Sequence, residues 1–347
     1  MVGLAGRPVP GDRDRAGGQP GGRGGQHPAV RRRRGRVRHG RLRADRRHRR
    51  RAPGHRPLPR PDHAAVRGGC AVRLGILTDG RVVAVDGERV VDVTAVLPGG
   101  PTDYPDRAGE VAAYVAGAPS IATRTPTFTA PVAHPRTVLA APVNYAPHRG
   151  ELGDRSPEGG RLDARALGLI VLAPGSVVGP DGAIELPDLP GREFHYEGEI
   201  AVVIGRPCRG VDRAHAMDHV LGYTGLLDIT MRIGPQGQED RSMRKSFRTF
   251  TPIGPVVLTA DEVPDPSILR LRLALNGEPR QDGGLDELIV DVPDLVVRAA
   301  QLLPLQPGDL IATGTPGGVG AIVPGDRVTL TVDGVGELAM DVRRRSW

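Results

Sequence analysis

Carboxylates in two neighbouring segments are the residues whose spacing points most directly to chemistry. Glu197 and Glu199 lie two positions apart in the stretch EFHYEGEIAVVIG. Side chains two positions apart on a strand leave the same face, so both carboxylates would lie together beside the apolar run that follows. Asp228 interrupts a second apolar run, residues 220–227, which the sequence predicts to be a buried strand. Three carboxylates are therefore attached to buried strands.

A cation would explain why like charges are placed there. Carboxylates brought together in a poorly hydrated site repel and raise each other's pKa, so either they are solvated apart or a cation holds them. Oxygen ligands without a nearby Cys or His favour a hard ion, so the pattern predicts Mg²⁺, with Mn²⁺ or Ca²⁺ as alternatives, rather than zinc. A solvated strand face remains the other interpretation of an isolated E-x-E pair.

A histidine and a lysine outside these strands are further candidates. His148 and Glu151 are three apart in HRGE, which would place both on one face of a helical turn, where the carboxylate could orient the imidazole. An exposed surface pair is the alternative. Lys245 ends the charged segment QEDRSMRK and could be either a functional cation or a solvated side chain.

The glycine-rich stretch TGTP could bind an anion. Its backbone amides and the Thr315 hydroxyl could hold an oxyanion or a substrate carboxylate, whereas Gly314 and Gly317 could equally serve only to form a turn. Arg232 lies four residues after Asp228 and could bind a carboxylate through two hydrogen bonds, or pair with an acid of the metal site.

Charge divides the 347 residues into two unlike parts. Residues 1–71 contain 20 arginines, no lysine and four aspartates, a net charge of +16, whereas the rest holds 27 basic and 36 acidic side chains, a net charge of −9. The head lacks apolar periodicity and is predicted to be disordered. It is either an arginine-rich tail for nucleic acid or a membrane surface, or not part of the native protein, with Val72 encoded by an alternative start codon.

The acidic body argues against a nucleic-acid function, and its 3% aromatic content weakens any proposal of base stacking. No apolar run approaches the roughly 18 residues of a membrane-spanning helix, and the head does not resemble a signal peptide. The two cysteines, Cys70 and Cys208, lie on either side of the head's boundary, so a structural disulfide is not expected. A cytoplasmic location and no membrane partner are expected.

Turn residues and apolar alternation predict a mainly β protein with a few helices. Asp79-Gly80 and Asp86-Gly87 would turn a meander that begins at Val72, one helix would cover 107–117, and the proline-rich stretch TRTPTFTAPVAHP would be a linker. Residues 72–128 would thus form a small N-terminal β domain, and 129–347 the larger domain.

Three further elements are predicted in the larger domain. Leu269, Leu271, Leu273 and Leu275 would share one face of a strand that turns at Asn276-Gly277. A helix would run from Pro293 to Leu303, since proline fits the first turn and Pro304 ends it. A last hairpin would turn at Asp333-Gly334.

Five motifs in order resemble the fumarylacetoacetate hydrolase family: VNYAPHRGE, FHYEGEIAVVIG, GYTGLLDITMR, RKSFRTFTPIGP and LQPGDLIATGTPGGVG. The resemblance covers about residues 138–342. It implies a mixed β-roll or sandwich catalytic domain, the small N-terminal domain and a homodimer. It implies these roles: metal ligands Glu197, Glu199 and Asp228; a water-activating dyad His148 and Glu151; and a charge-stabilising Lys245. Thr315 is expected to stabilise charge with Lys245, and Tyr145, Arg232 and Gly314 are the expected substrate contacts.

The family resemblance also implies the reaction. The expected activity is metal-dependent hydrolysis of a carbon–carbon bond in a 1,3-dicarbonyl acid such as an acylpyruvate or fumarylpyruvate, through a stabilised enolate. Isomerisation or tautomerisation of a 2-oxo acid, decarboxylation and sugar-acid dehydration are the family's alternatives. A non-catalytic member with only a structural metal is less expected.

Several positions depart from the family's usual residues. Val143 replaces a fourth carboxylate, Leu172 a lysine, Arg248 an aspartate and Leu227 an asparagine, and QDGGLDELIVDV replaces a Ser/Thr-rich stretch. The metal ligands are retained while substrate-recognition positions differ, so the standard substrates of the family are in doubt.

Overall fold

The computed structural model describes residues 72–121, 126–146, 162–234, 237 and 239–346. All belong to one of two compact units of the chain, Pro59–Trp347. The predictions for the head, 1–71, and for the dyad His148 and Glu151 lie outside the described residues.

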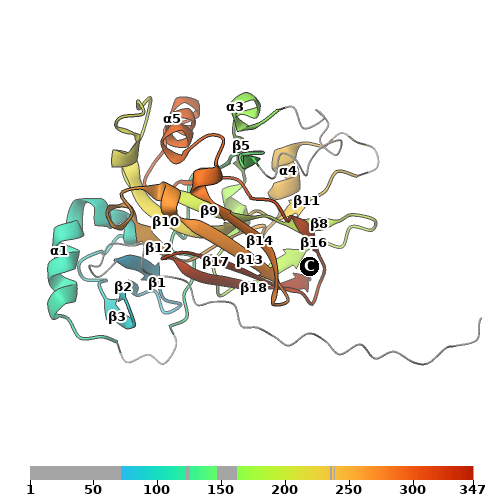
Figure 1. The fold of residues 1–347 in the computed structure, drawn as a ribbon. Coiled ribbons are helices and arrows are strands. Elements are labelled where there is room, and N and C mark those ends of the chain that lie inside the picture. Colours follow the sequence, from blue (N-terminus) through green and yellow to red (C-terminus); the bar gives the residue numbers. More distant parts are fainter. Residues whose placement is uncertain (1–71, 122–125, 147–161, 235–236, 238, 347) are drawn as a thin grey trace, which may run out of the picture. The chain divides into compact units, whose positions relative to one another are not determined.

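Most strands belong to one large sheet, which runs through the centre of Figure 1. In spatial order its strands are β3 (Arg89–Asp92), β2 (Val82–Asp86), β1 (Arg73–Ile76), β12 (Thr251–Thr259), β10 (Val220–Leu227), β9 (Gly198–Ile204), β15 (Leu310–Ala312), β4 (Val138–Ala140) and β5 (Ile170–Leu172), with β6 (Val177–Val178) pairing with β12. Every residue of β9 and β10 is buried, as expected of strands covered on both faces. The predicted strand 220–227 is confirmed.

The predicted N-terminal meander is present. Strands β1, β2 and β3 pair in antiparallel order, and Gly80 and Gly87 have the positive φ angles that these turns require. Strand β1 also pairs with β12, so this segment extends the large sheet. Helix α1 (Tyr104–Gly117) includes the predicted helix and begins three residues earlier. The division into two domains at residue 128 stays a prediction.

A second sheet has five strands. In order they are β14 (Glu278–Gly284), β13 (Arg270–Leu275), β17 (Arg327–Val332), β18 (Gly336–Arg344) and β7 (Ile184–Leu186). The predicted turns at Asn276-Gly277 and Asp333-Gly334 are confirmed, with positive φ at Asn276, Gly277 and Gly334. The alternation predicted for β13 fails at its end, where the pairing register shifts between Leu273 and Ala274 and leaves Leu275 half-buried.

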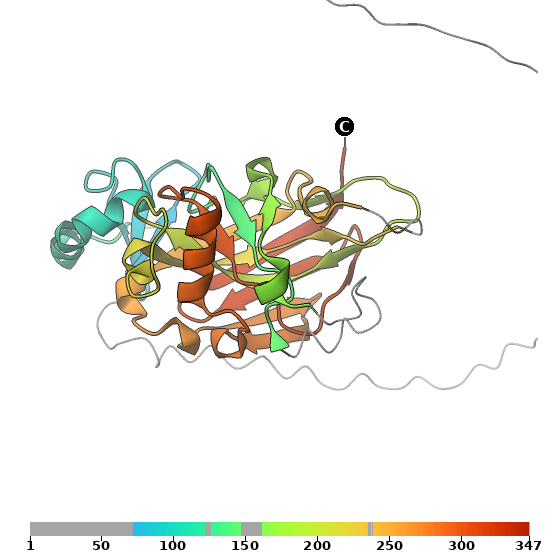
Figure 2. The ribbon, with the colours of Figure 1, turned by 90° about the horizontal axis from the view of Figure 1, so that it is seen from above.

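Three further α-helices are described. Helix α5 (Val292–Leu302) agrees with the predicted helix to within one residue at each end, and the Asp291 side chain accepts a hydrogen bond from the Asp294 amide at its start. It lies against β15 on one side of the large sheet (Figure 2). The others are short, α3 (Ala164–Leu167) and α4 (Arg241–Lys245).

The site is positioned by two neighbouring chain segments, each of which contributes one strand to a small sheet and one to the large sheet. A three-stranded sheet has the order β11 (Thr230–Met231), β8 (Phe194–Tyr196), β16 (Gly320–Ile322). The chain passes from β8 into β9 at Glu197, and from β10 into β11 at Asp228 and Ile229. The first segment therefore passes from the small sheet to the large one and the second from the large sheet to the small one, and the two changes of sheet are adjacent, because the Asp228 amide donates to the Glu197 carbonyl at 2.8 Å.

In the part of the chain that the structure describes, no helix has the length and apolar character needed to cross a membrane.

Candidate metal centre and active site

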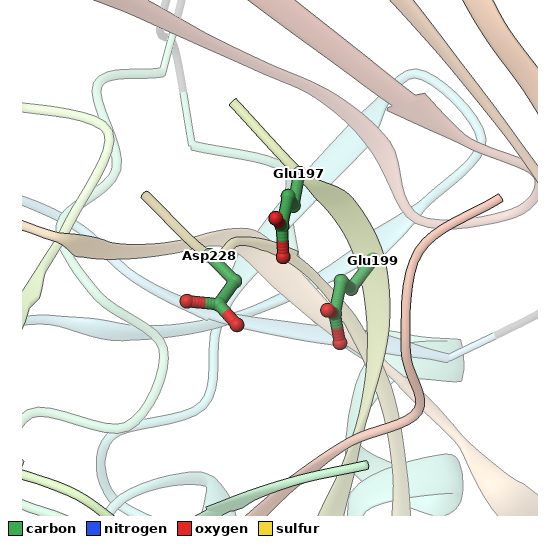
Figure 3. Close-up of side chains that lie close together, drawn as sticks. All are labelled: Glu197, Glu199 and Asp228. Carbon is green, nitrogen blue, oxygen red and sulfur yellow. The ribbon is translucent and has the colours of Figure 1, made fainter. Parts of the chain in front are cut away.

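The three predicted carboxylates converge. Glu197, Glu199 and Asp228 each offer one oxygen, and these oxygens lie within 4.8 Å of one another, as the stick view shows (Figure 3). The residues are 8%, 2% and 2% exposed. Glu199 lies on β9, whereas Glu197 lies in the break between β8 and β9, so the prediction that both belong to one regular strand is wrong. The change of sheet at Glu197 nevertheless leaves the two side chains together.

Two cations lie against this triad. The Lys245 ammonium donates to Asp228 Oδ2 at 2.5 Å, to Glu197 Oε2 at 2.9 Å and to Thr230 Oγ1 at 2.7 Å. The Arg232 guanidinium donates to Glu197 Oε1 at 2.8 Å. Lys245 is 7% exposed, which excludes the solvated side chain that its charged neighbours suggested. The sequence left open whether Arg232 binds a substrate carboxylate or pairs with an acid of the metal site, and the structure shows the pair with Glu197.

Burial is the largest single influence on the pKa values of Glu199, Asp228 and Lys245. It raises the pKa of Glu199 well above its ordinary value, and the Asp228 charge adds to this effect while Lys245 opposes it. Burial also raises the pKa of Asp228 to about 6, against the lowering effect of Lys245. For Lys245, burial lowers the pKa, but the charges of Asp228 and Glu197 outweigh burial and the net shift is upward. Lys245 is therefore an ammonium ion at neutral pH.

The residues present fit a hard divalent cation. Three carboxylates face two cationic side chains, so the ionised cluster retains an excess negative charge. Asp228 Oδ1 is buried and has no hydrogen-bond partner among the described residues. A buried carboxylate oxygen without a donor is costly, and an ion would satisfy it. The all-oxygen donor set is of the kind that Mg²⁺, Mn²⁺ and Ca²⁺ prefer.

The TGTP turn holds one ligand of this set. The Gly314 amide donates to Glu199 Oε2 at 2.7 Å and so holds this carboxylate of the triad in place. Gly314 has φ of 100°, and a Cβ there would lie 2.9 Å from Asn144 Cβ, so only glycine fits. Thr315 is 4% exposed, and its hydroxyl accepts a hydrogen bond from Gln281 Nε2 at 2.8 Å. Substrate contacts of Gly314 and Thr315 stay predictions.

Tyr145 lies close to the triad and is fully buried. Burial raises the pKa of its phenol, and the charge of Glu199 is the second cause. Tyr145 forms an isolated bridge with Leu288, and the next residues of its motif, which carry His148 and Glu151, lie outside the described ranges. The dyad and a substrate contact of Tyr145 therefore stay predictions.

Three of the positions that depart from the family pattern have clear local environments. Leu172 is fully buried, and Leu227 is buried at the end of β10. Arg248 is exposed and pairs with Glu185 at 2.6 Å. Leu172 stands where the family usually has a lysine, and Leu227 where it usually has an asparagine. Both leucines are apolar, so neither position supplies a polar side chain.

Val143 stands in a left-handed backbone conformation, with φ of 51°. This conformation costs an L-residue roughly 1–2 kcal/mol, and a β-branched side chain tolerates it poorly, whereas Asn adopts it readily. We expect Val143→Asn to raise the midpoint of thermal unfolding by about 2–4 °C. Val171→Asn, at an exposed position of β5, is the matched control and should not raise it. A midpoint that is unchanged or lowered in Val143→Asn would contradict the strain.

Sequence reasoning missed two buried amides beside the triad. Asn144 donates to the carbonyls of Thr313 and Val290, and Gln281 contacts both the TGTP turn and the Gly198 amide. Asn144 lies inside a recognised motif, but its spacing carries no sign of these partners. Gln281 lies in the polar stretch EPRQDGG, which has no apolar alternation from which a strand or a buried face could be read.

Comparisons with known proteins agree with this geometry. The family model described as fumarylacetoacetate (FAA) hydrolase, C-terminal, matches residues 137–343. The maleylpyruvate hydrolase of Aquipseudomonas alcaligenes is 34% identical over 283 residues, which cover 76% of this chain and 97% of that protein. The bifunctional isomerase/decarboxylase of 4-hydroxyphenylacetate degradation from Salmonella dublin is 37% identical over 220 residues, 63% of this chain and 49% of that protein.

A solved structure gives the same relationship in three dimensions. The crystal structure of maleylpyruvate hydrolase from Sphingobium sp. SYK-6, in complex with manganese(II) and pyruvate, is 35% identical, with a TM-score of 0.67. The similarity covers 79% of this chain and all of that one. The family model spans more than half of this chain and includes the whole carboxylate triad. The chain belongs to the fumarylacetoacetate hydrolase family.

Proposed function

We propose that this protein is a divalent-metal-dependent hydrolase that cleaves a carbon–carbon bond of an acylpyruvate, a 1,3-dicarbonyl acid. The observation that carries the proposal is the buried triad of Glu197, Glu199 and Asp228 with the Lys245 ammonium against two of its members. Two relatives that cover most of this chain are named maleylpyruvate hydrolase, and one of them binds manganese(II) and pyruvate. Both names support the substrate class.

The charge around the triad supports an anionic substrate. Arg232 and Lys245 touch the triad, and Arg244 lies beside Lys245 on α4. Burial lowers the pKa of Arg244, and the charges of Arg232 and Arg241 lower it further. With a divalent ion added to the three carboxylates and to the Arg232 and Lys245 cations, the net charge of the centre is positive, which would attract a substrate that carries carboxylates.

Each component has a role in the reaction. Glu197, Glu199 and Asp228 would hold the ion, which supplies Lewis-acid stabilisation of an enolate when bound. The Lys245 ammonium stays charged because its pKa is raised, and it offers a second positive charge to the developing enolate or to the substrate carboxylate. Arg232 holds Glu197 in place, and the Gly314 amide holds Glu199.

The proton and the electron pair can be followed through the cleavage. His148, oriented by Glu151, would take one proton from water as the water oxygen bonds to the acyl carbon. The bond between the acyl carbon and the methylene carbon then breaks, and its electron pair forms the enolate of pyruvate. Protonation of the methylene carbon by the histidinium completes the cycle, so the products are a carboxylic acid and pyruvate.

A direct assay tests the proposal. Purified protein is mixed with an acylpyruvate and Mg²⁺ or Mn²⁺, while enol absorbance and pyruvate are followed together. We expect loss of the enol signal with stoichiometric pyruvate, abolished by EDTA and restored by excess metal. Intact substrate under all metal conditions, with both saturated and carboxylated acyl groups tested, would contradict hydrolysis.

The same assay separates the second candidate. The relative from Salmonella dublin is named an isomerase/decarboxylase, and a stabilised enolate serves those reactions too. Enol loss without pyruvate would indicate isomerisation, and release of carbon dioxide would indicate decarboxylation. Mg²⁺ as the native ion and a homodimer also belong to this proposal, and activity with each metal and light scattering in solution would test them.

A further inference from the structure

The polar stretch EPRQDGG contains one residue that links both parts of the metal centre. Gln281 lies on β14 and is 3% exposed, although its neighbours Arg280 and Asp282 are exposed. A buried carboxamide must satisfy two donors and an acceptor, so its partners show what it holds in place.

The acceptor side of Gln281 holds the backbone between two ligands. Gln281 Oε1 accepts a hydrogen bond from the Gly198 amide at 2.9 Å, and Gly198 is the residue between Glu197 and Glu199. A Cβ on Gly198 would lie 2.9 Å from Leu273 Cδ1 and 3.2 Å from Gln281 Oε1. The chain can therefore approach the amide this closely only because residue 198 is glycine.

The donor side of Gln281 holds the turn that contacts Glu199. Gln281 Nε2 donates to Thr315 Oγ1 and to the Pro316 carbonyl, each at 2.8 Å. These residues directly follow Gly314, whose amide donates to Glu199 Oε2. One carboxamide thus joins the backbone that carries two ligands to the turn that orients one of them.

We infer that Gln281 is a positioning residue of the metal centre, which sets the spacing between Glu197 and Glu199 and the orientation of the Glu199 carboxylate. The inference rests on the proposed function only in needing a metal at the triad. Groups that orient metal ligands are typically worth about 10–100-fold in metal affinity. Gln281 acts on the ion through Gly198 and through the turn, because its own polar atoms all have partners in the protein.

The test measures manganese binding to the complete chain without substrate. Gln281→Met keeps a similar length but removes the amide, and Arg280→Gln changes an exposed neighbour on the same strand as a control. Titration at a temperature where circular dichroism shows both variants folded should give a dissociation constant for Mn²⁺ that is about 10–100-fold weaker in Gln281→Met and unchanged in the control. Hydrogen exchange of the metal-free protein should be faster at the amides of residues 197–199 and of Gly314 and Thr315 in Gln281→Met alone.

The outcomes separate positioning from a general loss of stability. A folded Gln281→Met that binds Mn²⁺ within twofold of the unsubstituted chain would overturn the inference, whatever its unfolding midpoint. If Gln281→Met does not fold, Thr315→Val decides, because it removes one donor contact of Gln281 and no charge. Affinity at least threefold weaker in Thr315→Val supports the inference, and unchanged affinity overturns it. Failure of the unsubstituted chain to bind Mn²⁺ would instead refute the proposed metal centre.

Discussion

Glu199→Gln is expected to abolish metal-dependent turnover and, at the same time, to stabilise the metal-free protein. Stabilisation by a bound ion supplies several kcal/mol to the transition state, so loss of a ligand should lower kcat/KM by about 10³-fold or more. Glutamine retains an acceptor for the Gly314 amide, whose bond to Glu199 is 2.7 Å long, so the turn keeps its contact. The change therefore removes charge with little change of shape.

The gain in stability follows from the direction of the pKa shifts. Burial raises the pKa of Glu199, so its favourable contribution is present at low pH and is lost as the pH rises through the folded-state pKa. The pKa of Asp228 is likewise raised, from its ordinary value of 3.8 to about 6, so its contribution to stability is lost as the pH rises through this range. At pH 8 without metal, Glu199→Gln should therefore unfold about 2–5 °C higher than the unsubstituted chain.

Scanning calorimetry with EDTA or Mn²⁺ checks both parts of this expectation. Added Mn²⁺ should raise the midpoint of the unsubstituted chain and of Glu278→Gln, an exposed carboxylate on β14, but not that of Glu199→Gln. A metal-free Glu199→Gln that is less stable than the unsubstituted chain, yet still gains stability from Mn²⁺, would show that Glu199 is not a ligand.

His148→Ala is expected to lose about 10²–10⁴-fold in kcat, the usual worth of a general base, while Mn²⁺ binding stays unchanged. The reason is that His148 is assigned to the proton transfer from water and not to the ligand set. His134→Ala, which removes an exposed histidine, is the matched control and should keep full activity. Full turnover in His148→Ala would exclude the dyad, and loss of Mn²⁺ binding would move His148 into the metal centre.

Apolar continuity made the buried strands predictable. Residues 220–227 carry no charged side chain and are mostly apolar, and the structure has β10 at those bounds with every residue buried. Turn chemistry was equally informative, since Asn276-Gly277 and Asp333-Gly334 need positive φ and few residue pairs supply it. The convergence of Glu197, Glu199 and Asp228 was predicted because one pair lies within a single segment and Asp228 ends a buried strand.

Long-range pairing explains what the sequence could not show. The stretch FHYEGEIAVVI reads as one strand, but its first half pairs with β11 and β16 and its second half with β10 and β15. The same cause buries Lys245, whose local sequence is charged but whose partners Glu197 and Asp228 come from other segments. Gln281 is likewise buried by contacts with residues more than 30 positions away.

The place where β8 passes into β9 and β10 into β11 has a consequence for side-chain length. Glu197 and Asp228 are joined there through a backbone hydrogen bond, with the β9–β10 ladder on one side of it and the β8–β11 ladder on the other. Such a backbone cannot advance toward the ion to compensate for a missing methylene group, nor withdraw to accommodate an extra one. The site should therefore reject the exchange of aspartate for glutamate at either position, although both exchanges preserve charge and donor type.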